Sequence, residues 1–470
     1  MKMEQPIFLQ PAPALPATRL QRLGDAMQRH KHFIIGIQWA VVVFYLLLVT
    51  VPAFLPLPDI DASILNNLTL LAQFLFWGIW WPFVILSMFA FGRVWCGVFC
   101  PEGTLTELAS RHGMGRAVPR WLKWGGWPFV AFVLTTVYGQ LVSVYEYPKA
   151  VLLILGGSTV AAVAIGLVYG RGTRVWCRHL CPVSGVFGLL ARLAPVHFRV
   201  DRDAWDAAPS PHRQRVNCAP LIDMRRMKSA SECHMCGRCS GHRDAVKLAA
   251  RLPGSEVASL QPADAKAWEA RLLVFGIIGT AVGAFQWSAS PWFVTVKTQV
   301  ATWLIERDSY LLLQDNAPWW LLTHYPEAND VFTWLDGLGV LAYIAATALV
   351  LGGWVTLCLR LAGSLVPGNA KQNGRWLAYA LIPMGGLGVF LGLSALTVTL
   401  LKAEGVAMPW LPEVRGALLA LAALWSLRLG WRMTFALPGI SAVGAGAALT
   451  CLAAAIAGIV LPWTFMFFLW

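Results

Sequence analysis

The chain has 470 residues, of which 57% are hydrophobic and only 13% are charged. This composition excludes an ordinary soluble domain, because long apolar stretches recur from residue 33 to the last residue. The formal net charge of +13 does not indicate a nucleic-acid partner, since the basic residues gather in loops between the apolar stretches and favour contact with anionic lipid. The sequence therefore predicts an all-α polytopic membrane protein.

Apolar stretches long enough to cross a bilayer define the predicted helices. A hydrocarbon core of roughly 30 Å requires about 20 apolar residues, and about nine stretches approach that length. The eighth is the shortest. In chain order they are Phe33 to Leu55, Leu68 to Phe91, Trp127 to Val144, Val151 to Tyr169, Leu272 to Val294, Val331 to Leu359, Trp376 to Leu401, Val414 to Leu429 and Val443 to Trp463.

Basic residues and tryptophans predict how these helices sit in the membrane. With the N-terminus in the cytoplasm, 32 of the 37 Lys and Arg residues fall on the cytoplasmic side, as loops rich in positive charge do. Many of the 24 tryptophans lie near the ends of apolar stretches, where the ring is expected at the lipid headgroups. Examples are Trp80, Trp81, Trp319 and Trp320.

The chain divides into four segments on this topology. Residues 1–32 form a cytoplasmic N-terminal segment, and residues 33–200 contain the first four spans. Residues 201–270 form a cysteine-rich cytoplasmic loop with a modestly helical part around Ala245 to Leu260. Residues 271–470 form a five-helix region whose external loop, near residues 295–330, is acidic. Such a loop would suit a basic or metal-bearing partner, although outer loops lack Lys and Arg for topological reasons alone.

An internal repeat links the first four spans to a metal site. The sequence Arg-Val-Trp-Cys with a later Cys-Pro begins at Arg93 and recurs 81 residues later at Arg174. Each copy follows a membrane span, so the first four spans are two copies of one hairpin. The repeat predicts that two Cys-x3-Cys-Pro pairs meet at the cytoplasmic membrane surface. Their cysteines are Cys96, Cys100, Cys177 and Cys181.

A third group of cysteines lies in the cytoplasmic loop. Cys233, Cys236 and Cys239 show the Cys-x2-Cys-x2-Cys spacing that wraps a bacterial ferredoxin loop around an iron-sulfur cluster. The Cys-Pro that normally follows is absent, because Arg243 stands there. We expect Cys218 to supply the fourth thiolate, with a cysteine of a Cys-Pro pair as the rival. Eight thiolates then suffice for two [4Fe-4S] clusters, one held by each group of four.

Other chemistry fits some of the same residues. Four cysteines also hold structural zinc, and the Cys-x3-Cys-Pro pairs would suit copper or a redox dithiol. Cys358 and Cys451 fall in apolar spans and are interpreted as packing residues. Histidines and arginines near the cysteines would tune or ligate a cluster, or reflect ordinary surface and topological placement. These residues are His179, His234, His242, Arg93, Arg174, Arg178 and Arg238.

These motifs resemble the membrane polyferredoxins of the NapH and NosR type, in which pairs such as CGVFCP and CRHLCP follow membrane hairpins. The likeness covers roughly Phe33 to Arg251. It implies a bacterial inner-membrane protein that exchanges electrons between the quinone pool or cytoplasmic donors and a periplasmic system, and some relatives serve copper delivery. The stretch CHMCGRCSGHR before several further spans is similar to the FtrD kind of membrane ferredoxin in ferrous-iron uptake. The chain departs from the NosR pattern in lacking an external flavin-binding domain, and from both the NapH and NosR patterns in having a single ferredoxin-like cysteine triplet.

The second half offers little competing chemistry. Spans such as Leu272 to Val294 hold no ionisable residue in their cores, which counts against a permease with a regulatory cysteine loop. The glycine-rich stretch Gly385 to Gly392 would allow close helix packing or admit a quinone. No constellation of nucleophile, base and acid indicates hydrolytic or group-transfer catalysis. The leading hypothesis is iron-sulfur electron transfer with a periplasmic redox or metal-binding partner and permease or reductase subunits, and the alternative is a copper- or iron-handling assembly factor.

Overall fold

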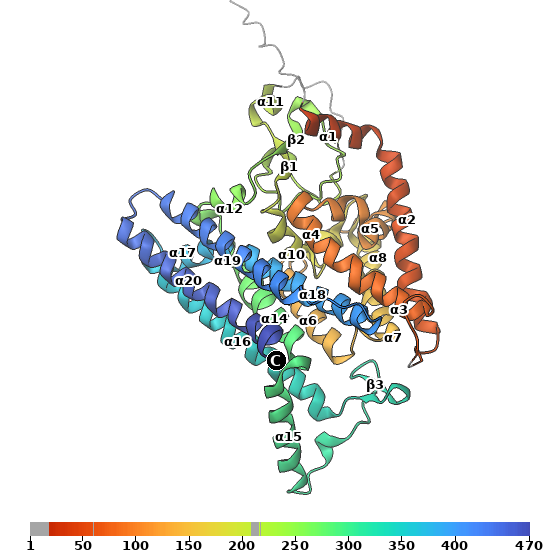
Figure 1. Cartoon of the computed structure of the whole chain (residues 1–470). Helices are drawn as coiled ribbons and strands as arrows, with labels where there is room; N and C mark the ends of the chain where they lie inside the picture. The colour runs from red at the N-terminus through yellow and green to blue at the C-terminus, as the bar shows by residue number, and fades with distance from the viewer. Residues whose placement is uncertain (1–17, 60, 208–215, 217) are drawn as a thin grey trace, which may run out of the picture.

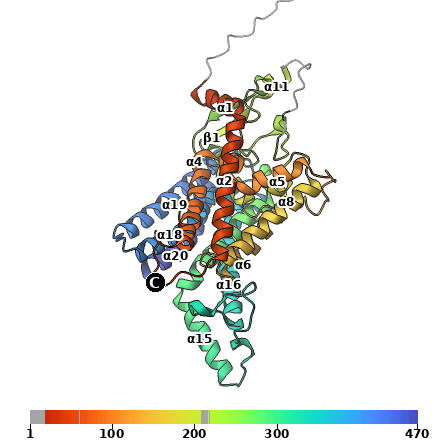
Figure 2. The same cartoon turned by 90° about the vertical axis from the view of Figure 1, so that its right-hand side faces the viewer.

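The computed structural model describes residues 18–59, 61–207, 216 and 218–470. Long helices form most of this part of the chain, together with two short pairs of strands. The protein is therefore an all-α polytopic membrane protein, as predicted. A cap containing β1 (Val196–Val200) and β2 (Val246–Ala250) covers one end of the helical bundle, and α15 (Pro291–Ile305) projects from the opposite end (Figure 1, Figure 2).

Eight helices of the described residues are long and apolar enough to cross a membrane. The third predicted span differs, because α6 (Trp127–Leu141) has only 15 residues and ends before Ser143, whose φ is +49°. The eighth predicted span is longer than expected and forms α19 (Leu411–Phe435). The eight helices are Lys31–Phe54, Leu68–Phe91, Pro148–Tyr169, Ala267–Ala289, Trp334–Ser364, Ala370–Ala403, Leu411–Phe435 and Ala442–Leu469.

One helix of the first half does not cross the bundle but folds back into it. Helix α5 (Pro101–Arg111) packs against α2 (Lys31–Thr50) and α8 (Gly157–Tyr169). The Thr106 hydroxyl donates to the Ala162 carbonyl at 2.7 Å, and the Met114 amide donates to the Leu167 carbonyl at 2.7 Å. Helix α5 therefore runs alongside α8 toward its C-terminal end. Such a re-entrant segment is tolerated at membrane depth because protein surrounds its backbone.

The second half packs tightly against the first through the glycine-rich helix α18 (Ile382–Ala403). A Cβ added at Gly386 would lie 2.4 Å from the ring of Phe89 and 2.5 Å from the side chain of Leu190. The Thr397 hydroxyl also donates to a carbonyl of the first half, that of Gly78, at 2.7 Å. The sequence left two roles open for Gly385 to Gly392, close helix packing or admission of a quinone, and the structure shows close helix packing.

The cap that contains β1 and β2 corrects one expectation. The residues after Ala245, predicted to be helical, begin instead with strand β2, which pairs antiparallel with β1 so that Val200 lies opposite Val246. Alternate residues of a strand face the same side, and here Phe198 and Leu248 are both buried in one small core with Cys233. Tertiary burial therefore overrides helix propensity at this position. A single short helix, α12 (Ser255–Ala258), follows.

Asn373 in α17 (Ala370–Ala378) closes the connection from α16 (Trp334–Ser364). Its buried side-chain amide donates to the carbonyls of Gly363, Val366 and Pro367 at 3.1 to 3.2 Å. Replacing Asn373 by Leu would leave these carbonyls unsatisfied. We expect a loss of about 1–3 kcal/mol in the free energy of unfolding, measured by thermal unfolding in detergent. An unchanged transition would show that the turn holds without these bonds.

Candidate metal centre

The structure brings the four cysteines of the repeat together. Cys96 lies in a single turn of π-helix (Trp95–Phe99), and Cys100 caps α5, where its sulfur accepts from the Gly103 amide at 3.3 Å. Cys177 lies in α9 (Val175–His179). Cys181 interacts electrostatically with the other three, and Cys100 interacts with Cys96 and Cys177. We call these four residues the repeat group.

The four cysteines between residues 218 and 239 also lie together. Cys239 interacts electrostatically with Cys233, Cys236 and Cys218, and Cys233 interacts with Cys236 and Cys218. The sulfur of Cys233 accepts from the Met235 amide at 3.4 Å. Cys218 thus lies beside the triplet, where a fourth thiol was expected. We call these four residues the loop group.

The two groups are in direct contact through their backbones. Gly97, inside the first Cys-x3-Cys-Pro pair, lies so close to the ferredoxin-like loop that an added Cβ would be 2.1 Å from the His234 carbonyl oxygen and 2.8 Å from the Cys236 amide nitrogen. The second pair contacts the other side of the loop, where the Arg178 guanidinium donates to the Pro220 carbonyl at 2.9 Å. The loop group is therefore held between the two repeats.

The donor set of each group fits an iron-sulfur cluster. All eight cysteines are free thiols, and backbone amides donate to sulfurs in both groups, as they do around such clusters. Burial raises the pKa of both Cys177 and Cys233 to about 12, so metal binding must displace their protons. Among the described residues, no group of three or more His, Cys, Asp or Glu side chains is arranged to hold a single metal ion. A four-iron cluster spaces its thiolates farther apart than one ion does.

A network of charges surrounds the junction of the groups. Glu107 on α5 accepts from the Arg174 Nε at 2.9 Å and from the Arg238 guanidinium at 2.7 and 3.1 Å. Burial alone would raise the pKa of Glu107, but the two arginines outweigh it and hold the pKa below its usual range. The carboxylate is therefore charged at neutral pH and neutralises part of the positive charge that faces the cysteines.

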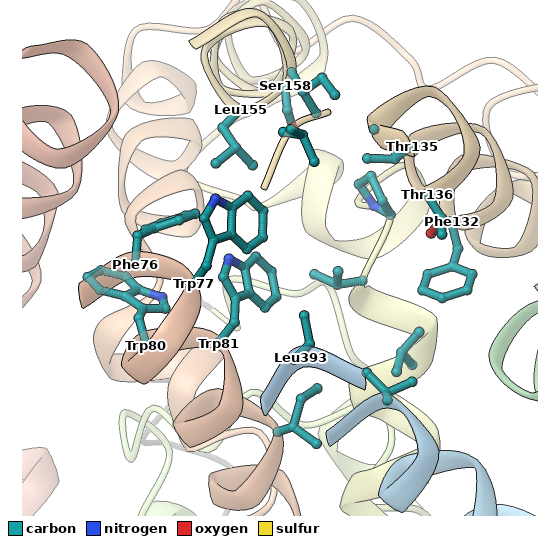
Figure 3. Close-up of a pocket in the computed structure, with 18 of the residues that line it drawn as sticks. Phe76, Trp77, Trp80, Trp81, Phe132, Thr135, Thr136, Leu155, Ser158 and Leu393 are labelled. Carbon is teal, nitrogen blue, oxygen red and sulfur yellow. The ribbon is translucent and has the colours of Figure 1, made fainter. Parts of the chain in front are cut away.

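An apolar cavity of about 210 Å³ opens beside the repeat group. Cys100 and Cys181 form part of its wall, and its polar side includes Glu102 and Ser158. Figure 3 shows the rings of Trp77 and Trp81 on one side of the cavity and Phe132, Thr135 and Thr136 on the other. The Glu102 carboxylate accepts from the indole nitrogen of Trp176 at 3.1 Å.

The depth of the repeat group differs from the prediction of a surface site. The Gln38 amide in α2 donates to the Gly97 carbonyl at 2.8 Å, and Tyr45, also in α2, lines the same cavity as Cys100. At 1.5 Å per residue, Tyr45 lies roughly 21 Å along α2 from Lys31. The repeat group is therefore recessed into the bundle, because α5 begins inside it rather than at its end.

Several residues around the groups were not identified from the sequence or were assigned differently. Trp80 and Trp81 were expected at the membrane interface, but both line the cavity in the middle of the span Leu68–Phe91. Glu107 carried no motif that marked it. The signal for Gly97 was present in the sequence, because the equivalent position of the second repeat holds the much larger Arg178.

The predicted histidines and the remaining cysteines occupy different environments. His234 is only 3% exposed, and its Nδ1 has no hydrogen-bond partner among the described residues. Burial lowers the pKa of His234 well below its ordinary value and that of His179 to about 4, so both are neutral at pH 7. Cys358 and Cys451 lie in α16 and in α20 (Ala442–Thr464), within spans and outside both groups.

Comparison with known proteins defines the class of site. Residues 73–125 and 153–201 match the family described as a 4Fe-4S binding domain, and these segments contain both Cys-x3-Cys-Pro pairs. The chain thus carries a ferredoxin-type 4Fe-4S binding domain within a multi-pass membrane protein.

Two relatives are similar over part of their length. One, from Escherichia coli strain K12, is named "Putative electron transport protein YccM" and is 25% identical over 229 residues, which cover 43% of this chain and 62% of the relative. The other is the methylamine utilization ferredoxin-type protein MauN of Paracoccus denitrificans strain Pd 1222, 29% identical over 145 residues, which cover 26% of this chain and 50% of the relative. The chain therefore spans less than two thirds of either relative. No solved structure matches it.

Proposed function

We propose that this chain is a multi-pass electron-transfer protein of the bacterial inner membrane that carries two [4Fe-4S] clusters. The observation that carries the proposal is the backbone contact at Gly97, which joins two groups of four thiols. Clusters held by groups in contact exchange electrons readily. In this proposal one cluster is bound by Cys96, Cys100, Cys177 and Cys181, and the other by Cys218, Cys233, Cys236 and Cys239.

We further propose that a quinone in the apolar cavity is the partner of the repeat group. The cavity lies among membrane spans, has aromatic walls, and shares Cys100 and Cys181 with the candidate cluster site. Ligand sites combine an apolar lining with a few polar groups, and here Ser158 and Glu102 are polar. Two electrons from reduced clusters and two protons from water convert a quinone to a hydroquinone, and the reverse reaction reduces the clusters.

A periplasmic partner is proposed at the opposite end of the bundle. There Tyr147 and Tyr325 stack with ring centroids 3.6 Å apart, and the Tyr147 hydroxyl donates to Asp330 at 2.7 Å. The acidic outer segment would suit a basic or metal-bearing redox protein, working with permease or reductase subunits. Placement of the chain among the NapH and NosR type polyferredoxins, and specifically with the FtrD kind in iron uptake, belongs to the same proposal and is supported by the cysteine pattern.

Filling the cavity tests the quinone proposal. Thr136 lines the cavity, so the larger side chain of Thr136→Trp should fill it. The quinone ring can then no longer approach Cys100, and we expect oxidation of the reduced clusters by a short-chain quinone to slow at least about tenfold. The measurement is the stopped-flow absorbance change of detergent-purified protein. Thr399→Trp, on an exposed face of α18, is the matched control and should react like wild type. Equal rates in the two variants, with full iron content, would exclude the cavity as the quinone site.

A further inference from the structure

Arg93 and Arg174 occupy equivalent positions in the two repeats, and each reaches into the other repeat. The Arg174 guanidinium donates to the carbonyl of Cys96 at 2.6 Å. The Arg93 guanidinium donates to the Ser184 hydroxyl at 2.9 Å, and that hydroxyl donates to the carbonyl of Cys177 at 2.7 Å. Each arginine therefore holds the backbone of the first cysteine of the opposite pair, once directly and once through a serine.

A single sequence difference explains why one contact is direct and the other is relayed. Gly103 and Ser184 are equivalent by the 81-residue repeat. A Cβ at Gly103 would lie 3.1 Å from the Arg174 Nη1, so the missing side chain gives the guanidinium room to reach Cys96. In the second repeat the Ser184 side chain fills the equivalent place and relays the hydrogen bond. The crossed arginines are thus built into both halves of the repeat.

Arg93 lies between the two groups of cysteines and lacks a counter-charge. It donates to the carbonyl of Ser231, just before the loop group, at 2.7 Å. It thus connects a backbone carbonyl next to the loop group with the Ser184 hydroxyl that bonds to the backbone of Cys177 in the repeat group. Arg93 is 5% exposed, and no carboxylate of the described residues pairs with it. A buried cation without a negatively charged partner is strongly unfavourable, and clusters ligated by four thiolates would supply the missing negative charge.

Arg174 also lies between the groups, but its charge is partly neutralised. Its backbone amide donates to the Ala219 carbonyl, next to Cys218, at 2.6 Å. It interacts electrostatically with Cys177 of the repeat group and Cys236 of the loop group. Unlike Arg93, it is paired with Glu107, whose carboxylate lies 2.9 Å from its Nε. The two crossed arginines therefore differ in the net charge that they present to the cysteines.

We infer that Arg93 and Arg174 are positioning residues that raise the reduction potentials of both clusters, that Arg93 has the larger effect, and that Glu107 opposes it. The inference rests on the proposed function, since it requires the clusters. A reduced cluster carries one more negative charge than an oxidised one, so a nearby cation stabilises the reduced form. A nearby carboxylate does the reverse.

Redox titration of the anaerobically purified full chain, followed by electron paramagnetic resonance, tests this inference. Arg93→Gln should lower the equilibrium constant for one-electron reduction of each cluster about tenfold, which corresponds to about 59 mV. Arg93→Lys should stay near the wild-type potential because it keeps the charge. Glu107→Gln should shift both potentials upward. Arg226→Gln, a control at a position whose side chain is 87% exposed, should leave them unchanged.

The outcomes separate this inference from the proposed function. Wild-type protein without clusters would overturn both. Clusters at full occupancy in Arg93→Gln with wild-type potentials would overturn the role of the arginines alone. Where Arg93→Gln does not retain its iron, the sign of the shift in Glu107→Gln decides, because that variant leaves both arginines in place. An absent or downward shift there would overturn the inference.

Discussion

Replacing Cys236 by Ser should reduce the iron content from about eight to about four atoms per chain, with an equal loss of acid-labile sulfide. The reason is that Cys236 belongs to the loop group and the repeat group retains its four thiols. Replacing Cys177 should remove the other four irons. The measurement is iron and sulfide analysis of anaerobically purified protein, combined with electron paramagnetic resonance.

Cys451→Ser is the matched control for these changes, because Cys451 lies in α20 and outside both groups. It should retain all of the iron. Zinc without sulfide in the wild-type protein would contradict the electron-transfer proposal as a whole. Iron that is lost only on changing Cys236 would leave one cluster in the loop group and return the Cys-x3-Cys-Pro pairs to copper or dithiol chemistry.

Gly97→Ala should disrupt the junction between the two groups. The new methyl would meet the His234 carbonyl oxygen at 2.1 Å and the Cys236 amide nitrogen at 2.8 Å. Both are backbone atoms, so no side chain can move aside to relieve the contact. We expect a cost of about 1–3 kcal/mol in the free energy of unfolding, together with partial loss of iron from the loop group.

The matched control for this change is Gly36→Ala, since an added Cβ at Gly36 has no atom within 4 Å. The temperature at which Gly36→Ala unfolds in detergent should equal or exceed that of the wild-type protein, because Ala favours the helix more than Gly does. If Gly97→Ala unfolds at the same temperature as Gly36→Ala and keeps its iron, neither the folding stability nor the iron content of the two groups depends on this contact.

Much of the fold was predictable because membrane spans depend on local composition. Apolar length located all eight long helices, and the repeat located both cysteine pairs. The exceptions depend on distant contacts. Val246 to Ala250 form a strand only because β1 lies beside them, and the helix from Trp127 is short because the chain turns at Ser143.

The grouping of the cysteines in the candidate site was predictable from the sequence, but the surroundings of the two groups were not. Spacing alone identified the cysteine triplet, and counting ligands pointed to Cys218, which lies beside the triplet in the fold. The prediction that the repeat group lies at the surface was wrong, because the group is recessed in the bundle. Nothing in the sequence around Pro101 to Arg111 reveals that this helix folds back along α8. Glu107 and the cavity depend on the same re-entrant helix, so they were invisible for the same reason.

The seating of the loop group between the repeats constrains how the protein is made. The triplet emerges from the ribosome after both hairpins. Its backbone nevertheless fits against Gly97 of the first hairpin, and Pro220, close to Cys218, accepts from Arg178 of the second. The loop therefore cannot reach its final position until both hairpins have been inserted and have met. If the proposed clusters are present, their loading is accordingly expected to follow insertion of both hairpins and to precede the final placement of the loop over the recessed cysteines of the repeat.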